Sequence, residues 1–365
     1  MKIGIYSDAH FSKHSSIFIG KHTDSEYSKR LHTLIKSFEW LYSVFSEQQA
    51  DLIINCGDMT SSETIASEEN SAIAKALSYS KGIPEIHLLG NHEIQDASRK
   101  FSSVDLIEGY AHCRVIRELT VIKDSSVSLI FIPYIAEESQ LQTIQEKLLN
   151  VDYPAVVFSH INYLGEGLLN GNGFIDTNGI DKDTVFLNSN IRRIFNGHLH
   201  NPLEVSHYIQ IGSLIGNGFG DSYSFSKPRI LIYDTISDEI KSFLNPFAIL
   251  FYKLKVRNIS ELKAGLEQLD ISSKCLQVNC SLSLREHVSN YLFNNSEQYH
   301  IEDFRVKSEI ESNLIQPMDK SIAEKIEKIS DNKSTLDLLK LFTEHSEDMP
   351  ASLPVMLHFL EKYFV

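Results

Sequence analysis

The chain has 365 residues, of which 42% are hydrophobic and 22% charged, a composition that excludes disordered and fibrous proteins. This length is long for a single hydrophobic core and predicts about two domains. The formal net charge of −14 argues against an extended basic surface: either the substrate is not nucleic acid, or the basic surface is local, or metal ions and a partner supply the missing positive charge.

Nothing in the sequence predicts contact with a membrane. No stretch approaches the roughly 18 apolar residues of a spanning helix, and the N-terminus reaches an acidic residue too early for a signal peptide. The cysteines are too few and too scattered for a disulfide framework; they are Cys56, Cys113, Cys275 and Cys280. We therefore expect a cytoplasmic protein with reduced thiols.

The first 250 residues alternate short apolar runs with amphipathic segments, which is typical of a layered α/β domain. Strands are predicted at 2–7, 51–57, 85–90, 127–134, 155–159, 191–195, 207–213 and 229–235. Helices are predicted at 28–48, 66–80 and 137–149, where apolar residues recur every three or four positions. The expected fold is α/β (or α+β), a sandwich of two β-sheets flanked by helices.

The pattern changes at about residue 251. Three predicted strands alternate with two predicted helices in a compact β-α-β-α-β unit; the strands are 251–258, 274–282 and 299–310, and the helices are 259–270 and 284–293. After Pro317 the chain reads as polar and then amphipathic helices, of which 334–342 and 355–364 are the most apolar.

Each buried strand of the first domain is followed by residues of the kind that bind metal ions. They are Asp8 and His10, Asp58, the run Asn91, His92 and Glu93, then His160, and finally His198 and His200. A single acid at a strand end is usually a helix cap, and an isolated His-x-His is usually a surface pair. Five such blocks are different, because the carboxyl ends of strands in α/β sheets converge on one crevice.

The chemistry of these residues is consistent with two divalent metal ions. Carboxylates, imidazoles and an amide oxygen suit Mn²⁺, Fe²⁺ or Zn²⁺, and the absence of cysteine argues against a purely structural zinc site. The set is too large for one ion. Two ions about 3.5–4 Å apart need a bridging carboxylate, for which Asp58 is the natural candidate.

The order Asp-x-His, Gly-Asp, Gly-Asn-His-Glu, His, Gly-His-x-His resembles that of the calcineurin-like metallophosphoesterases over residues 1 to about 215. The resemblance implies two sets of metal ligands: Asp8, His10, Asp58 and His200 for the first ion, and Asp58, Asn91, His160 and His198 for the second. It also implies that His92 is a catalytic histidine that binds neither ion. A water held between two cations loses a proton near neutral pH and can attack phosphorus in line.

Three features resemble the nuclease subunit of SbcCD-type complexes: the stretch 208–214, the small α/β unit and the helical tail. This resemblance implies a phosphoesterase domain over 1–250, a DNA-capping domain over 251–312 and a partner-binding segment over 313–365. It further implies a DNA exonuclease or endonuclease for end processing, recombination or repair. The expected metal is Mn²⁺, with Mg²⁺, Fe²⁺ or Zn²⁺ as alternatives.

The expected partners are DNA and an SMC-like ABC ATPase of the SbcC type, in a heterotetramer that contains a homodimer of this chain. The cell would be bacterial or phage-infected. Two other functions stay open: a phosphodiesterase or phosphatase for small substrates, and a non-catalytic scaffold. The apolar stripes near the C-terminus either bind the ATPase or pack on their own protein.

Two surface features each allow two interpretations. The segment 161–190 is rich in Gly and Asn and is either a rim of the site or a solvated connection. Basic residues near the first motif either meet a phosphate backbone or are ordinary surface charges; they are Lys13, Lys21, Lys29 and Arg30.

Overall fold

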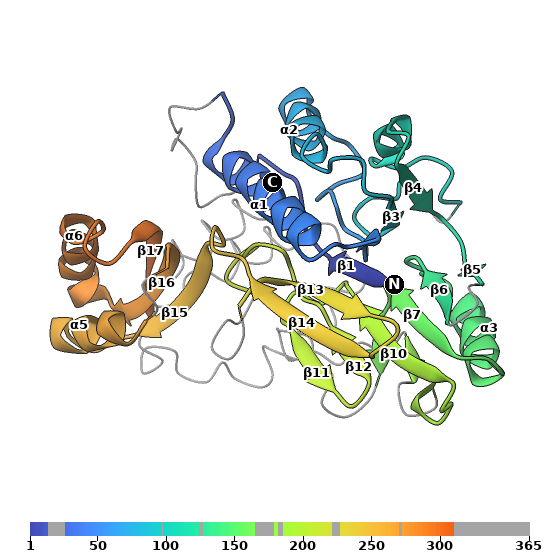
Figure 1. Cartoon of the computed structure of the whole chain (residues 1–365). Helices are drawn as coiled ribbons and strands as arrows, with labels where there is room; N and C mark the ends of the chain where they lie inside the picture. Colours follow the sequence, from blue (N-terminus) through green and yellow to red (C-terminus); the bar gives the residue numbers. More distant parts are fainter. Residues whose placement is uncertain are drawn as a thin grey trace, which may run out of the picture. The chain divides into compact units, whose positions relative to one another are not determined.

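Two six-stranded β-sheets form the centre of the fold (Figure 1). The computed structural model describes residues 1–13, 26–96, 98–123, 127–164, 179–181, 185–220, 227–269 and 272–309. The predicted partner-binding segment 313–365 and most of the predicted loop 161–190 lie outside these residues. Within the described residues, each helix is too short or too polar to cross a membrane.

The first sheet has the strand order β14-β13-β1-β2-β3-β4. The strands are β1 (Lys2–Tyr6), β2 (Leu52–Asn55), β3 (Glu85–Leu88), β4 (Cys113–Ile116), β13 (Arg229–Asp234) and β14 (Glu239–Leu244). Strands β1 to β4 run parallel, whereas β13 pairs antiparallel with β1, and β14 pairs antiparallel with β13. The carboxyl ends of β1, β2 and β3 therefore lie at one edge of this sheet.

The second sheet has the order β11-β12-β10-β7-β6-β5. The strands are β5 (Thr120–Ile122), β6 (Ser128–Ile132), β7 (Ala155–Ser159), β10 (Ile191–Asn196), β11 (Leu203–Val205) and β12 (Tyr208–Gln210). Strands β6, β7, β10 and β12 are parallel, and the two edge strands pair antiparallel with their neighbours. A short two-stranded sheet, β8 (Tyr163–Leu164) with β9 (Ile180–Asp181), follows β7.

Alternation of side chains along the strands produces the layers. Ile3 and Ile5 of β1 pack with Phe158 and Phe195 of the second sheet in a core between the two sheets. Tyr6 points the other way, into a core shared with helices α1 (Lys29–Glu47) and α2 (Ser67–Leu77). Helix α3 (Glu138–Leu149) packs in the same manner on the outer face of the second sheet (Figure 1). The predicted sandwich flanked by helices is confirmed.

A smaller unit follows with its own three-stranded sheet. Its elements are β15 (Leu250–Lys255), α5 (Ile259–Gln268), β16 (Lys274–Ser281), α6 (Arg285–Asn294) and β17 (Ile301–Glu309). This is the predicted element order, and a separate hydrophobic cluster joins both helices to the sheet. The domain boundaries and the DNA-capping role stay predictions.

Candidate metal centre

The side chains singled out in the sequence follow five strands of the two sheets. Asp8 and His10 follow β1, Asp58 follows β2, Asn91 and His92 follow β3, His160 follows β7, and His198 and His200 follow β10. The two sheets bring these strand ends together, and the structure places all eight side chains in one cluster. Their roles as ligands or catalysts remain predictions from the family pattern.

One group of donors consists of Asp8, His10 and His200. The Nε2 atoms of His10 and His200 are 3.0 Å apart. Asp8 Oδ1 lies 3.9 Å from His10 Nε2 and 4.0 Å from His200 Nε2. Two ligand atoms that each lie about 2.1 Å from one ion are at most about 4.2 Å apart. These separations therefore suit a single cation.

A second group surrounds Asn91. Its Oδ1 lies 3.1 Å from His160 Nε2 and 3.0 Å from His198 Nδ1. The other ring nitrogen of His160, Nδ1, is 2.7 Å from the backbone oxygen of Cys56. When Nδ1 carries the proton and donates it to that oxygen, the lone pair of Nε2 faces the cluster, as metal binding requires.

Asp58 connects the two groups. Its Oδ2 lies 3.6 Å from His10 Nε2 in the first group and 3.4 Å from His160 Nε2 in the second. Burial alone would raise the pKa of Asp58, but the imidazoles of His160 and His10 outweigh it and hold the pKa well below its usual range. The carboxylate between the groups is therefore ionised and placed to bridge two cations.

His92 lies at the open side of the cluster. Its Nε2 is 4.0 Å from Asp58 Oδ2, and 46% of its side chain is exposed. Its Nδ1 lies 3.2 Å from the backbone oxygen of Ser61, which orients the ring. By distance alone, His10, Asp58 and His92 also form a possible donor group. The exposure of His92, in contrast to buried His10 and His160, is consistent with contact to a substrate.

The backbone at the cluster is unusual. Asp8, His10, Asp58 and His198 have φ values of 52°, 51°, 53° and 72°, in the left-handed region that non-glycine residues rarely adopt. Each such residue costs of order 1–3 kcal/mol and persists only where the surrounding structure enforces it. Hydrogen bonds from the backbone N of Asp8 to Gly57 O and of His10 to Asp58 O, both 3.0 Å, help to enforce it.

Two features show how tightly the motifs fit. A Cβ atom added to Gly90 would overlap the Asp58 carboxylate, so only glycine allows β3 to approach Asp58 this closely. Asp8 Oδ2 accepts a hydrogen bond from the backbone N of His198 at 3.1 Å. Its other oxygen, Oδ1, is buried and accepts no hydrogen bond from the described residues. A cation at the first group would supply the missing partner.

Two residues, Glu93 and Arg30, support the cluster in ways that the sequence did not predict. Glu93 is fully buried and accepts hydrogen bonds from the backbone N of Gly90, Met59 and Thr60, at 2.7, 2.5 and 3.2 Å. Its carboxylate thus joins the loop after β2 to the loop after β3. Its place in the Gly-Asn-His-Glu motif was the only sequence signal.

Arg30 requires a correction. The sequence offered it as a surface cation, either for phosphate contact or without a role, but Arg30 is only 6% exposed. It donates to the backbone oxygens of His10 and Gly216, both at 3.2 Å, and to Asn217 Oδ1 at 2.5 Å. Arg30 therefore supports the loop that carries His10.

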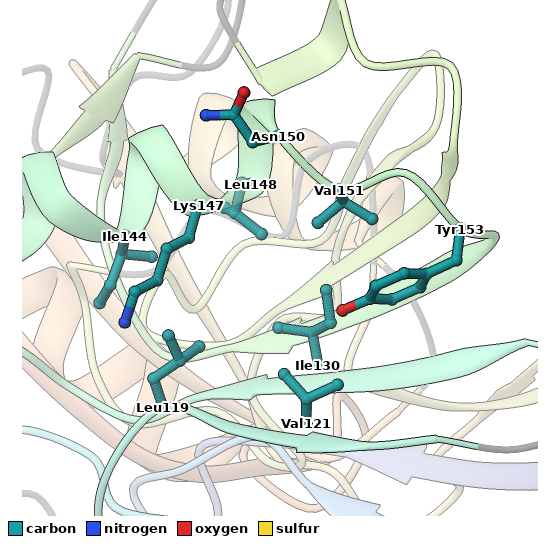
Figure 2. A pocket seen from close by; sticks show the side chains of 9 residues that line it. All are labelled: Leu119, Val121, Ile130, Ile144, Lys147, Leu148, Asn150, Val151 and Tyr153. Carbon is teal, nitrogen blue, oxygen red and sulfur yellow. The ribbon is translucent and has the colours of Figure 1, made fainter.

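A separate apolar pocket lies away from these side chains. It has a volume of about 320 Å³ between α3 and the edge of the second sheet, where Ile144 and Leu148 face Val121 and Ile130 (Figure 2). None of the clustered site residues lines it. Its walls are mostly apolar, and Lys147, Asn150 and Tyr153 are the polar residues that line it.

Comparison with known proteins identifies the pattern. The model of the calcineurin-like phosphoesterase family matches residues 1–202. A search of curated proteins found no match. Among solved structures, a protein of Thermus thermophilus is 12% identical with a TM-score of 0.40, covering 67% of this chain and 98% of its own. A dimetal phosphatase from Danio rerio is 11% identical with a TM-score of 0.39, and the match covers 67% of this chain and 98% of that protein. A Pseudomonas putida nuclease is 13% identical with a TM-score of 0.29, and the match covers 62% of this chain and 82% of that protein.

Proposed function

The chain belongs to the calcineurin-like phosphoesterase family, and we propose that within this family it is a Mn²⁺-dependent nuclease that hydrolyses phosphodiester bonds of DNA. The observation that carries the chemical part of the proposal is the position of Asp58. Its carboxylate lies between two groups of metal-binding side chains, with half-exposed His92 beside it.

The donor set fits two divalent ions. Asp8, His10, Asp58 and His200 would hold one, and Asp58, Asn91, His160 and His198 the other. When bound, the two ions supply positive charge that lowers the pKa of the attacking water and neutralises the phosphoryl oxygens. Oxygen and imidazole donors without cysteine suit Mn²⁺, and also Mg²⁺, Fe²⁺ or Zn²⁺.

His92 acts on the substrate from the open side. With Nδ1–H directed at Ser61 O, the protonated ring presents Nε2–H toward the space next to Asp58. From there it donates a hydrogen bond to a phosphoryl oxygen and a proton to the departing oxygen. His92 is therefore the proposed general acid, and Asp58 orders the site beneath it through the 3.1 Å bond from His92 N to Asp58 Oδ1.

DNA is proposed as the substrate because the chain carries a β-α-β-α-β unit beyond the phosphoesterase domain, over residues 250–309. A small diester would not need this unit. The same layout supports an SMC-like ABC ATPase as the partner, bound by residues 313–365, with two copies of this chain in the assembly. The partner's nucleotide state would then control access of DNA to the metal centre.

One set of parallel assays tests the proposal. Purified protein with Mn²⁺ is offered linear double-stranded DNA, single-stranded DNA and bis-p-nitrophenyl phosphate, each with a chelator control and with His92→Ala as the inactive reference. We expect metal-dependent cleavage of DNA. The set is repeated with a phosphoprotein substrate and with the ATPase added. Cleavage of the small diester or of the phosphoprotein, with every DNA left intact in both conditions, would refute the nuclease assignment. Loss of all activity with both metals bound would point to a scaffold.

A further inference from the structure

Phe101 is a large apolar side chain that the fold leaves exposed. The residue is 62% exposed and belongs to none of the hydrophobic clusters among the described residues. By contrast, Val104 and Ile107, which follow it, are buried in the core shared with α1 and α2. A single exposed phenylalanine is common on protein surfaces, so the surroundings of its ring must indicate whether it has a function.

Backbone contacts attach the residues after Phe101 to the loop after β3. Ser102 forms an isolated antiparallel bridge with Ile94, and the backbone N of Ser103 donates to the backbone oxygen of Glu93 at 3.1 Å. Glu93 and Ile94 directly follow the histidine proposed as the general acid. Phe101 therefore lies at the start of a segment that is bonded to the loop carrying this histidine.

The same segment contacts the loop after β2. Ser103 Oγ lies 2.5 Å from Thr60 Oγ1, and the next residue of that loop, Ser61, orients the ring of His92. Consecutive Cα atoms are about 3.8 Å apart and those of paired residues about 5.5 Å, so the Cα atoms of Phe101 and His92 are separated by at most about 17 Å. Nucleotides follow one another every 3.4 Å or so along a stacked strand, so the Phe101 ring lies within about five nucleotides of the bond that is cleaved.

The residues before Phe101 are anchored as well. Arg99 adopts a left-handed conformation, with φ at 54°, and its backbone N donates to the backbone oxygen of Asp96 at 3.1 Å. Its guanidinium donates to Gln140 Oε1 at 2.9 Å and to the backbone oxygen of Arg117 at 3.2 Å. The backbone at Phe101 is therefore held from both sides, so stacking of the ring on a ligand costs little conformational entropy.

The surroundings of the Phe101 ring match one nucleotide. The ammonium of Lys100 lies 5.4 Å from the ring centroid, and both residues are exposed. Proteins that bind single strands combine an aromatic ring, on which a base stacks, with cations that meet the phosphates. An anchor for a protein partner normally lies in a larger apolar patch, whereas the sequence neighbours of Phe101, Lys100 and Ser102, are polar.

We infer that Phe101 stacks on an unpaired nucleobase of the DNA strand bound at the metal centre, with Lys100 next to the adjoining phosphate; the inference rests on the proposed function. A base within a duplex has both faces covered by its neighbours, whereas an unpaired base offers a face to an aromatic ring. The inference thus adds the substrate class, which is single-stranded or locally unpaired DNA. Stacking contributes binding and no chemistry, so Phe101 is a substrate-binding residue that acts beside the proposed metal ligands and His92.

The test compares three variants of the full-length chain. Phe101→Leu removes the ring and keeps an apolar side chain, whereas Phe101→Trp keeps an aromatic face. Phe247→Leu is the control, because it removes a ring that is 41% exposed between β14 and β15. Binding of single-stranded oligonucleotides, each with one 2-aminopurine at a successive position, is measured with Mn²⁺ in a His92→Ala background, by anisotropy and by the quenching that accompanies stacking. Hydrolysis of single-stranded DNA and of bis-p-nitrophenyl phosphate is measured with His92 present.

For Phe101→Leu we expect the Kd for single-stranded DNA to rise about 5–100-fold and the quenching at one 2-aminopurine position to be lost. The slope of log K against log salt should stay the same, because no charge is removed. The KM for single-stranded DNA should rise, while kcat and hydrolysis of the small diester are unchanged. Phe101→Trp should restore affinity and quenching, and the control variant should match the wild type. A fully paired hairpin should bind the wild type and Phe101→Leu more nearly alike.

Three results would overturn the inference, and they are distinguishable. If the wild type cleaves DNA and Phe101→Leu keeps full affinity and quenching, Phe101 does not stack and the proposed function stands. If Phe101→Leu weakens binding of single strands and of the paired hairpin equally, and Phe101→Trp restores neither, the ring supports the local structure instead of a base. If the wild type neither binds nor cleaves any DNA, the proposed function itself fails and the inference fails with it.

Discussion

Replacement of Arg30 by methionine tests whether the metal centre depends on a buried cation that binds no metal. Methionine keeps an apolar stem of similar length but removes the guanidinium, which donates to His10 O, Gly216 O and Asn217 Oδ1. The loop that carries His10 would then lose its connection to residues 216 and 217. We expect the first donor group, Asp8 with His10 and His200, to lose its geometry.

The expected change in the free energy of unfolding of Arg30→Met follows from two opposing contributions. A hydrogen bond from a charged group contributes about 1.5–3 kcal/mol, and three such bonds are lost. Burial of the guanidinium itself costs several kcal/mol, which the substitution recovers. The free energy of unfolding should therefore fall by only about 1–3 kcal/mol, and the variant should fold. Loss of a residue that orients a ligand typically costs about 10–100-fold in metal affinity, and we expect this loss at one of two sites.

Calorimetric titration with Mn²⁺ and metal counting by native mass spectrometry measure this effect. At limiting Mn²⁺ the wild type should hold two ions and Arg30→Met one, with the second restored at high Mn²⁺. Lys29→Met is the matched control, because Lys29 precedes Arg30 and its ion pair with Glu302 is partly exposed. Two ions bound with wild-type affinity in Arg30→Met would refute the reasoning.

The other predictions concern the ligands, the proton balance and the chain end. Asp58→Asn should weaken the binding of both metal ions, because the bridging carboxylate loses its charge. His92→Ala should keep both ions and lose turnover. Metal counting and rate measurement test this, and a lost ion or near-normal turnover in His92→Ala would contradict it. Burial lowers the pKa of His160, but the charge of Asp58 outweighs it and raises the pKa to about 9 without metal. A metal must displace that proton, so the affinity for Mn²⁺ should rise with pH up to about 9. Calorimetry measures this affinity, and equal values at pH 6 and pH 8 would contradict the prediction. Truncation at residue 315 should leave hydrolysis of bis-p-nitrophenyl phosphate unchanged and abolish co-purification with the ATPase; a truncated chain that still binds it fully would exclude the tail as the partner site.

Much of the site could be predicted because its signals are local. Each candidate side chain follows directly after a strand whose apolar run is visible in the sequence, as with Ala155–Ser159 before His160. Parallel strands then bring such ends together without further information. The long helices were equally visible: the predicted 28–48 is observed as Lys29–Glu47, because its apolar period is regular and Ser28 caps it through a bond from Leu31 N.

What the sequence did not reveal depends on contacts between distant residues. Arg30 meets Gly216 and Asn217 across 186 and 187 positions, and no local pattern distinguishes it from a surface cation. Strand β14, Glu239–Leu244, was missed because it is an edge strand with mostly exposed side chains and little apolar signal.

The two donor groups differ in how far the protein alone balances the charge and supplies the hydrogen bonds of their carboxylates. In the second group the buried carboxylate of Asp58 has the imidazole of His160 at 3.4 Å, so charge is balanced before any metal binds. In the first group Asp8 Oδ1 is buried without a hydrogen bond from the described residues, and burial raises the pKa of Asp8. The first group thus depends more on a metal for its charge balance. It also depends on support from outside the cluster, because His10 is held in a left-handed conformation and its carbonyl oxygen is bound by Arg30. A variant that removes this support should therefore affect the first ion before the second, which is the asymmetry that the Arg30→Met titration measures.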